Sequence, residues 1–269
     1  MLVTINDDFD LQKICDSGQC FRCRPIGKST YRFITRQEVL YIRQVTSTEY
    51  EVSCGPDAWE QTWIPYFDLH RNYQAIRDQV HDDPFMLRAA AAGRGIRILR
   101  QDPWETLISF ILSQQKRIPA IRNIIEKLAC IYGEPIPSEH EELYSFPSPA
   151  ALAGADLKDC RMGYREKYVK STSILINKQP DLFKRWANLD EEALLLSLKE
   201  LPGVGDKVAN CVMLFAYGRT ACAPIDTWIR KIINKEYAGE NPFPEYGDIA
   251  GILQQYAFYY AQQYKEEFP

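Results

Sequence analysis

The sequence lacks any hydrophobic run as long as the roughly eighteen residues that a membrane-spanning helix needs. Residues 1–8 also lack the positively charged and then apolar pattern that begins a secretory signal peptide. Membrane and secreted proteins are therefore not expected. Disulfides are rare in the cytoplasm, so we expect the eight cysteines to be reduced thiols of a cytoplasmic protein.

An excess of positive charge is also lacking, because the net charge is -4. This balance argues weakly against a nucleic-acid partner, since duplex binding relies on lysine and arginine. Local charge differs from the total: residues 158–170 carry five basic and two acidic side chains, and 5 minus 2 gives +3. Lys116, Arg117 and Arg122 form a second basic group. Solvated helix faces would explain both groups as well as a phosphate-binding surface would.

A complete metal-binding cysteine pattern is missing too. Cys15, Cys20 and Cys23 have the C-x4-C-x2-C spacing of part of a plant-type iron–sulfur motif. No fourth ligand follows at a suitable spacing, and Cys54 is only a remote candidate. We therefore expect no metal site and no resident cofactor.

The hydrophobic pattern predicts an α+β fold in two parts. Residues 30–35, 38–45 and 50–54 are rich in β-branched and aromatic residues, and the first two runs alternate with the period of a strand. From about residue 60 onward the pattern becomes helical. We predict an N-terminal antiparallel sheet region with flanking helices over 1–84, and a helical region over 85–269. The predicted helices span 61–67, 71–80, 84–92, 103–114, 117–132, 147–154, 164–177, 190–198, 206–217, 226–236 and 245–264.

The segment Leu201–Lys207 (Leu-Pro-Gly-Val-Gly-Asp-Lys) combines a glycine turn with the start of a predicted helix. Amides at a helix N-terminus attract anions such as phosphate. Lys207 lies in the first turn of that helix and Cys211 lies four residues later, on the same face. A lysine amine that is partly neutral can attack an electrophilic carbon and form a Schiff base. Asp226 precedes another predicted helix, where a carboxylate is a favourable cap even without a catalytic role.

Together these residues resemble the helix-hairpin-helix "GPD" superfamily of DNA glycosylases, and in particular its 8-oxoguanine DNA glycosylase branch. The similarity covers nearly the whole chain and consists of five ordered matches. The matching segments are Ser17–Arg22, Gly95–Glu105, Gly163–Arg165, Leu201–Cys211 with Asp226, and Gln254–Phe258. The resemblance implies an N-terminal sheet like that of the TATA-binding protein, packed on a helical glycosylase core.

The resemblance also implies a bifunctional mechanism on a nucleotide that is flipped out of duplex DNA. Lys207 would attack the sugar C1′, expel 8-oxoguanine and hold the sugar as a Schiff base. β-Elimination would then nick the strand. Asp226 would stabilise the developing positive charge and help to position or deprotonate the amine.

The same resemblance assigns four residues to the recognition of the damaged base. Gly18 would present its carbonyl oxygen to N7–H of 8-oxoguanine, where guanine carries an acceptor instead. Cys211 and Phe258 would cover the two faces of the base, and Gln254 would bond its Watson–Crick edge. Gln254 and Phe258 are four residues apart, so one helix face can present both.

Contacts with the DNA around the flipped nucleotide are implied as well. Gln115 and Arg165 would read the orphaned opposite base, and Tyr164 would fill the stack. The better-known eukaryotic members have an arginine where this chain has Ala120, which cannot bond a base. We therefore expect a relaxed opposite-base preference. Trp228 likewise replaces a histidine that would lie near the 5′ phosphate.

The hairpin residues Gly203, Val204 and Gly205 would hold a backbone phosphate, with a monovalent cation at the hairpin carbonyls when DNA is bound. We further expect a monomer in the cytoplasm, associated with the nucleoid. The short ends without targeting extensions suit a prokaryotic protein. Two alternatives remain open at this point. One is a monofunctional alkylbase glycosylase, which uses water and needs no lysine. The other is a DNA-binding module without catalysis, which Lys207 and Asp226 argue against.

Overall fold

A five-stranded antiparallel sheet forms the N-terminal part of the computed structural model, which describes residues 1–138 and 141–269. The strand order is β1-β5-β4-β3-β2. The strands are β1 (Leu2–Thr4), β2 (Cys23–Gly27), β3 (Thr30–Thr35), β4 (Glu38–Gln44) and β5 (Glu49–Val52). The three predicted strands are confirmed within two residues at each end. β1 and β2 were not predicted, because β1 has three residues and β2 contains a proline and a glycine.

One face of this sheet carries its own hydrophobic core. In the β3–β4 pairing, Phe33 lies opposite Leu40 and Tyr31 lies opposite Ile42. These side chains are buried with Trp63 of the segment that follows β5. That segment comprises α2 (Pro56–Ala58), a π-helical turn (Trp59–Trp63) and α3 (Ile64–Tyr66). The sequence predicts one helix over 61–67, whereas the structure has a helical segment that begins earlier and contains a π-helical turn.

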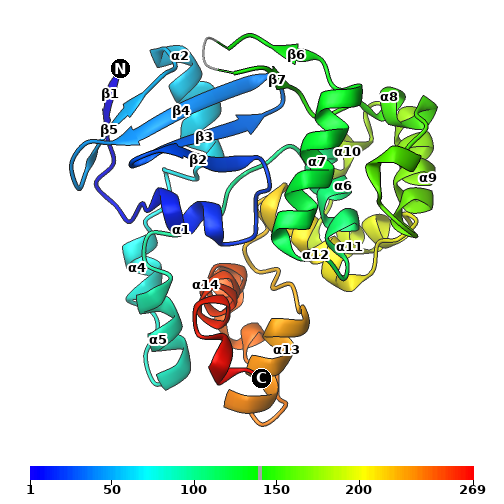
Figure 1. Cartoon of the computed structure of the whole chain (residues 1–269). Helices are drawn as coiled ribbons and strands as arrows, with labels where there is room; N and C mark the ends of the chain where they lie inside the picture. The colour runs from blue at the N-terminus through cyan, green and yellow to red at the C-terminus, as the bar shows by residue number, and fades with distance from the viewer. Residues whose placement is uncertain (139–140) are drawn as a thin grey trace.

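The rest of the chain is helical, and a short strand pair interrupts it (Figure 1). The helices are α1 (Leu11–Asp16) in the sheet region, then α4 (Tyr73–Arg77), α5 (Pro84–Ala92), α6 (Pro103–Ser113), α7 (Ile118–Tyr132), α8 (Pro149–Gly154), α9 (Arg165–Asn177), α10 (Leu182–Ala187), α11 (Glu191–Lys199), α12 (Asp206–Phe215), α13 (Thr227–Glu236) and α14 (Ala250–Gln263). β6 (Pro135–Ile136) pairs with β7 (Leu143–Tyr144). Three 3₁₀ segments cover Lys158–Cys160, Phe243–Ile249 and Lys265–Glu267.

Several helices begin with a capping side chain followed by proline. Asp83, Asp102 and Ser148 each accept a hydrogen bond from the amide three residues later. Proline suits the first helical position, because its missing N–H would have no partner in the helix. These signals explain why the predicted starts at 84 and 103 match the structure, and why the start near 147 differs by two residues.

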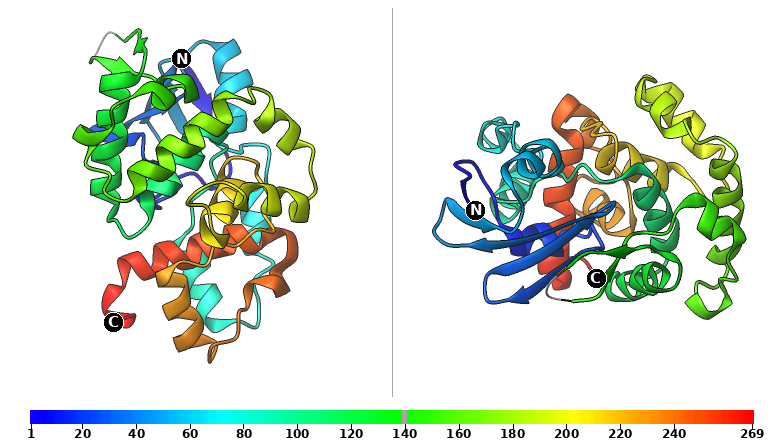
Figure 2. Two further views of the ribbon diagram at one scale, coloured as in Figure 1. Left: turned by 90° about the vertical axis from the view of Figure 1, so that its right-hand side faces the viewer. Right: turned by 90° about the horizontal axis from the view of Figure 1, so that it is seen from above.

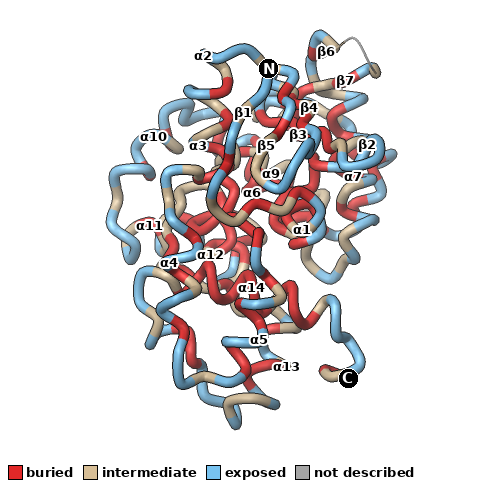
Figure 3. Tube along the Cα trace, turned by 90° about the vertical axis from the view of Figure 1, so that its left-hand side faces the viewer, coloured by how far each residue is buried: buried red, intermediate tan, exposed pale blue. Residues whose placement is uncertain are grey.

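The helix α14 runs through the middle of the molecule, where α13 and α5 pack against it (Figure 2). Figure 3 shows that the most deeply buried segments pass through this centre. The predicted helix over 245–264 is wrong in its first turn. Gly247 has φ +50 and ψ -125, which places a kink inside the 3₁₀ segment Phe243–Ile249 that precedes α14. A glycine adopts this backbone conformation without the strain that a side chain would add.

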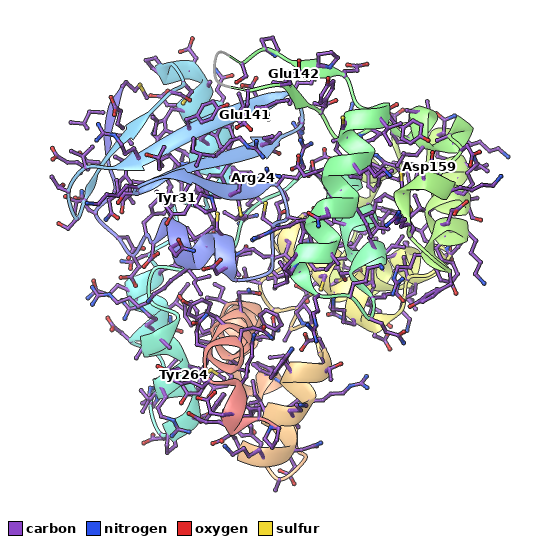
Figure 4. All side chains as sticks on the ribbon, in the orientation of Figure 1. Arg24, Tyr31, Glu141, Glu142, Asp159 and Tyr264 are labelled. Carbon is purple, nitrogen blue, oxygen red and sulfur yellow. The ribbon has the colours of Figure 1, made fainter. Side chains whose placement is uncertain are left out.

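The sheet also contacts the helical part through charged groups. Arg32 pairs with Glu141 at 2.7 Å, and Arg24 lies 3.6 Å from Glu126 of α7. Figure 4 shows Arg24 and Glu141 at the end of the sheet nearer to α7. The exact division of the chain at residue 84 stays a prediction.

Within the described part of the chain, no helix combines the length and apolarity that crossing a membrane would require. The arrangement as a whole is α+β, as the sequence predicts.

Candidate active site

A cavity of about 700 Å³ brings together six of the predicted site residues. They come from the loop after α1 and from α12, α13 and α14. The six are Gly18, Lys207, Cys211, Asp226, Gln254 and Phe258. The remaining wall comes mainly from α6, α7 and the turn between them.

Lys207 lies in the first turn of α12 and is half-buried. Its Nζ donates a hydrogen bond to Ser113 Oγ over 3.3 Å. The same Nζ lies 4.8 Å from the ring centroid of Phe110. Because α6 packs along α12, these two α6 side chains meet the amine inside the cavity.

Asp226 is the N-cap of α13, as the sequence suggested, and its Oδ1 accepts from the Ile229 amide over 2.9 Å. Burial raises the pKa of the Asp226 carboxyl above its ordinary value, although the Ile229 amide and Lys207 oppose this effect. No ion pair joins Asp226 to Lys207 among the residues that the structure describes. The carboxylate therefore faces the cavity beside the amine without being tied to it.

Cys211 lies one turn after Lys207 and is 2% exposed. Burial raises the pKa of its thiol to about 11, while the nearby Lys207 lowers it. The thiol is therefore protonated at neutral pH and presents a small, uncharged surface to the cavity.

Gly18 is held in a rigid loop with φ +74, a conformation that favours glycine. On one side, the buried Gln19 donates to Ser17 Oγ and to the Arg97 carbonyl, each over 2.9 Å. Gln255 of α14 donates to the Ser17 carbonyl. This bonding fixes the backbone on both sides of Gly18.

Phe258 packs directly against Gly18. A Cβ at position 18 would lie 3.0 Å from Phe258 Cε1, which is closer than nearly all real contacts of this kind. The absent side chain is thus what allows the aromatic ring to lie here.

Gln254 is 3% exposed, and its Oε1 has no hydrogen-bond partner among the described residues. Burying an unpaired acceptor carries a free-energy cost of about 1–3 kcal/mol. A polar ligand in the cavity would remove that cost. The Gln254 acceptor is therefore available to a polar ligand in the cavity.

The hairpin between α11 and α12 lies just outside the cavity. Gly203 has φ +80, and a Cβ there would lie 2.6 Å from the Tyr168 ring. Gly205 is the exposed N-cap of α12 and provides no side chain to bond the first amides of the helix. Val204 is buried and anchors the hairpin. The uncapped amides form a suitable site for a phosphate.

Gln115, Tyr164 and Arg165 do not line the cavity. Gln115 is exposed in the turn after α6 and has φ +51, an uncommon conformation for glutamine. Tyr164 is 46% exposed, and the Arg165 guanidinium lies 4.3 Å from its ring centroid. Arg165 itself is buried, and its guanidinium donates to the main-chain oxygens of Gln114 and Met162. In this structure it therefore braces the turn that carries Gln115.

Three residues that the sequence did not predict also line the cavity, namely Ser113, Phe110 and Lys265. No motif distinguishes Ser113 or Phe110 from other residues of a helix face. Lys116 and Arg117 were noted only as a basic group, and they also line the cavity.

The three cysteines with iron–sulfur-like spacing lie away from this cavity. Cys15, Cys20 and Cys23 are buried in the core of the sheet. Contact with Cys23 and burial raise the pKa of the Cys20 thiol well above its ordinary value. Burial likewise raises the pKa of the Cys23 thiol, so Cys20 and Cys23 are protonated side chains of the core.

The family model for the N-terminal domain of 8-oxoguanine DNA glycosylase matches residues 1–107. An N-glycosylase/DNA lyase of Saccharomyces cerevisiae is 31% identical over 260 residues, which cover 84% of this chain and 68% of the yeast protein. A probable N-glycosylase/DNA lyase of Methanothermobacter thermautotrophicus is 30% identical over 204 residues, or 64% of this chain. That match spans 65% of the archaeal protein, slightly less than two thirds of its length.

A solved structure agrees over almost the full length. It is the 8-oxoguanine glycosylase/lyase of Clostridium acetobutylicum, bound to double-stranded DNA with cytosine opposite 8-oxoguanine. The match has a TM-score of 0.89 and 31% identity, and it covers 98% of each chain. This protein belongs to the 8-oxoguanine DNA glycosylase/lyase family.

Proposed function

We propose that this protein excises 8-oxoguanine from duplex DNA and then cuts the abasic strand by β-elimination. One observation carries the proposal: the Lys207 amine, the Asp226 carboxyl and the unpaired Gln254 acceptor share one cavity. The cavity volume of about 700 Å³ is within the usual range for small-molecule sites and gives room for a flipped nucleotide.

The chemistry begins at the sugar. The neutral amine of Lys207 attacks C1′, and the electrons of the glycosidic bond leave with the base, which takes up a proton. Loss of a proton from nitrogen and opening of the sugar ring give a Schiff base. Removal of a C2′ proton then breaks the C3′–oxygen bond and nicks the strand. Asp226 stabilises positive charge on the sugar, which is the kind of electrostatic help that a fixed carboxylate provides.

Base recognition uses the other side of the cavity. The Gly18 carbonyl accepts from N7–H of 8-oxoguanine and repels the N7 lone pair of guanine. Gln254 bonds the Watson–Crick edge. Phe258 and the neutral thiol of Cys211 enclose the two faces of the base.

The surrounding surface holds the duplex. Amides of Gly203, Val204 and Gly205 and of the first turn of α12 bind a backbone phosphate. Tyr164 enters the gap that the flipped nucleotide leaves, and its exposed ring supports this role. Gln115 faces the orphaned base, and Arg165 contributes to its recognition indirectly, by supporting the Gln115 turn through the Gln114 carbonyl.

A monovalent cation is proposed at the hairpin carbonyls when DNA is bound. Carbonyl oxygens suit a hard cation. Pro202 and Gly203 already accept one hydrogen bond each through these oxygens, from Thr172 and from Gln114. A carbonyl oxygen has two lone pairs, so each retains one for a cation.

The proposed enzyme acts as a monomer, because all the groups named above come from one chain. We also propose that it works in a prokaryotic cytoplasm, associated with the nucleoid. The near full-length similarity to a Clostridium protein supports a prokaryotic origin.

Borohydride trapping tests the proposal. With duplex DNA containing 8-oxoguanine, borohydride is expected to reduce the Schiff base and give a covalent complex. Lys207→Gln should remove the complex and slow base release by about 10³-fold or more, as expected when a covalent nucleophile is lost. Lys178→Gln, a change at an exposed lysine outside the cavity, serves as the control.

Two outcomes would contradict the mechanism. Failure of the unaltered protein to be trapped would exclude the lyase step. Full base release by Lys207→Gln would indicate the alternative, a monofunctional glycosylase in which water is the nucleophile. Excision of alkylated bases but not of 8-oxoguanine would indicate the same alternative.

A further inference from the structure

The hydroxyl of Ser113 is the oxygen that holds the amine of Lys207 in this structure. Nζ donates to Ser113 Oγ over 3.3 Å, and no other oxygen of the described residues accepts from it. We infer that Ser113 is a positioning residue, which turns the nucleophilic lone pair of Lys207 toward the sugar. This inference rests on the proposed function, since it concerns the nucleophile of that reaction.

The Ser113 hydroxyl is oriented by a hydrogen bond within its own helix. It donates its proton to the Phe110 carbonyl over 2.8 Å, one turn earlier in α6. A hydroxyl has one donor and two acceptor lone pairs, so its remaining capacity is only that of an acceptor. Ser113 therefore accepts from Lys207 and offers no proton to the amine.

The neutral amine has two N–H groups and one lone pair. When one N–H points at Ser113, the lone pair must point in another direction. If the hydroxyl could donate, it would bond this lone pair and block the attack. Because its proton is already committed to Phe110, the Ser113 hydroxyl does not bond this lone pair. The neighbouring Cys211 thiol also contacts the amine, from within the same helix.

A second contact limits where the amine can lie. The Phe110 ring is 4.8 Å from Nζ and forms the wall beneath it. This ring is stacked on Phe215 of α12, with centroids 5.4 Å apart and planes at 17°. Phe21 contacts the ring with centroids 5.6 Å apart. The acceptor and the wall thus belong to a helix that is packed firmly against the one carrying Lys207.

Asp226 does not perform this task. It forms no ion pair with Lys207 among the described residues, and Oδ1 accepts from the Ile229 amide. Asp226 and Ser113 both line the cavity. The carboxylate is therefore available for the charge that develops on the sugar, while Ser113 holds the amine before the substrate arrives.

The test compares Ser113→Ala, Ser113→Thr and Ser109→Ala in the full chain. Ser109 lies one turn earlier on α6, is buried and does not line the cavity, so it is a matched serine-to-alanine control. Single-turnover base release at saturating DNA isolates the chemical steps, and borohydride trapping reports Schiff base formation. DNA affinity and thermal unfolding are measured for each variant.

Ser113→Ala should slow base release and trapping by about tenfold, the effect of losing one hydrogen bond that orients a reacting group. DNA affinity should be unchanged. Ser113→Thr keeps the hydroxyl and should remain close to the unaltered protein, as should Ser109→Ala.

Three results would overturn the inference: a normal rate for Ser113→Ala, a threonine variant as slow as the alanine variant, or an equal loss in Ser109→Ala. All three leave the proposed function standing, because that depends on trapping of the unaltered protein. Failure to trap the unaltered protein would instead contradict the proposed function itself.

Discussion

The side-chain amide of Gln114 donates to the Gly203 carbonyl oxygen over 3.0 Å and joins the turn after α6 to the hairpin before α12. From the other side, the Arg165 guanidinium donates to the main-chain oxygen of Gln114. Gln114 therefore connects the turn that carries Gln115, the helix that begins at Arg165, and the phosphate-binding hairpin. Three parts of the proposed DNA surface are held in one geometry.

Removing this connection should weaken DNA binding. Gln114→Ala loses the bond to Gly203, and one such bond contributes about 1 kcal/mol, so we expect roughly fivefold weaker binding of an 8-oxoguanine duplex. Titration with a fluorescent duplex measures the effect. Gln79→Ala is the control, because the exposed Gln79 side chain bonds the Ala75 carbonyl of its own helix. Equal affinity of the two variants would show that the connection does not organise the DNA surface.

The caps and the glycine turn were predictable because they are local. A carboxylate before a helix and glycines before a lysine are properties of neighbouring residues, so Asp226 and the hairpin were found from the sequence. The burial of Arg165 and the bond between Lys207 and Ser113 depend on packing between α6, α9 and α12. These contacts join residues far apart in the chain, so no spacing pattern in the sequence predicts them. The short β1 was missed for a different reason, since its strand is defined by pairing with β5.

Asp226→Asn should separate catalysis from stability. Asparagine can still cap α13 through its side-chain oxygen, so the helix start is retained. Base release should fall by about 10²–10³-fold, because a fixed charge near the developing cation is lost. Single-turnover kinetics measure this loss. Asp190→Asn, at the exposed cap of α11, should leave the rate unchanged.

The raised pKa of Asp226 sets the sign of two further effects of this change. Burial disfavours the ionised carboxylate in the folded state. The resulting loss of stability is present at neutral pH and disappears as the pH falls below 3.8, the ordinary aspartate pKa that applies in the unfolded chain. Asp226→Asn should therefore be at least as stable as the unaltered protein at pH 7, as measured by urea unfolding. The unaltered enzyme should lose activity as the pH falls through the raised pKa. A variant that is clearly less stable at pH 7 would contradict this account.

Gly18→Ala should damage both the loop and the cavity. Alanine at φ +74 is strained by about 1–2 kcal/mol, and its Cβ would lie 3.0 Å from Phe258 and 3.2 Å from Ile118. We expect a lower free energy of unfolding by about that amount, together with slower excision of 8-oxoguanine. Gly154→Ala is the matched control, because Gly154 lies in α8 and nothing lies within 4 Å of its added Cβ. If both variants behaved alike, neither backbone strain nor contact with Phe258 would explain the glycine at 18.

The side chain at position 120 is expected to set the preference for the base opposite the lesion. Ala120 is exposed in the first turn of α7, next to Pro119 of the cavity wall, and its methyl group cannot bond a base. Excision of 8-oxoguanine opposite each of the four bases should therefore proceed at similar rates. In Ala120→Arg, a guanidinium can bond the edge of cytosine, and a specific contact of this kind contributes about 1–3 kcal/mol. The preference for cytosine should then rise by about tenfold or more. Ala75→Arg adds the same charge at an exposed position of α4 and should change the rates on all four duplexes together. A sharp cytosine preference in the unaltered protein would show that other residues, Gln115 foremost, read the opposite base without an arginine at 120.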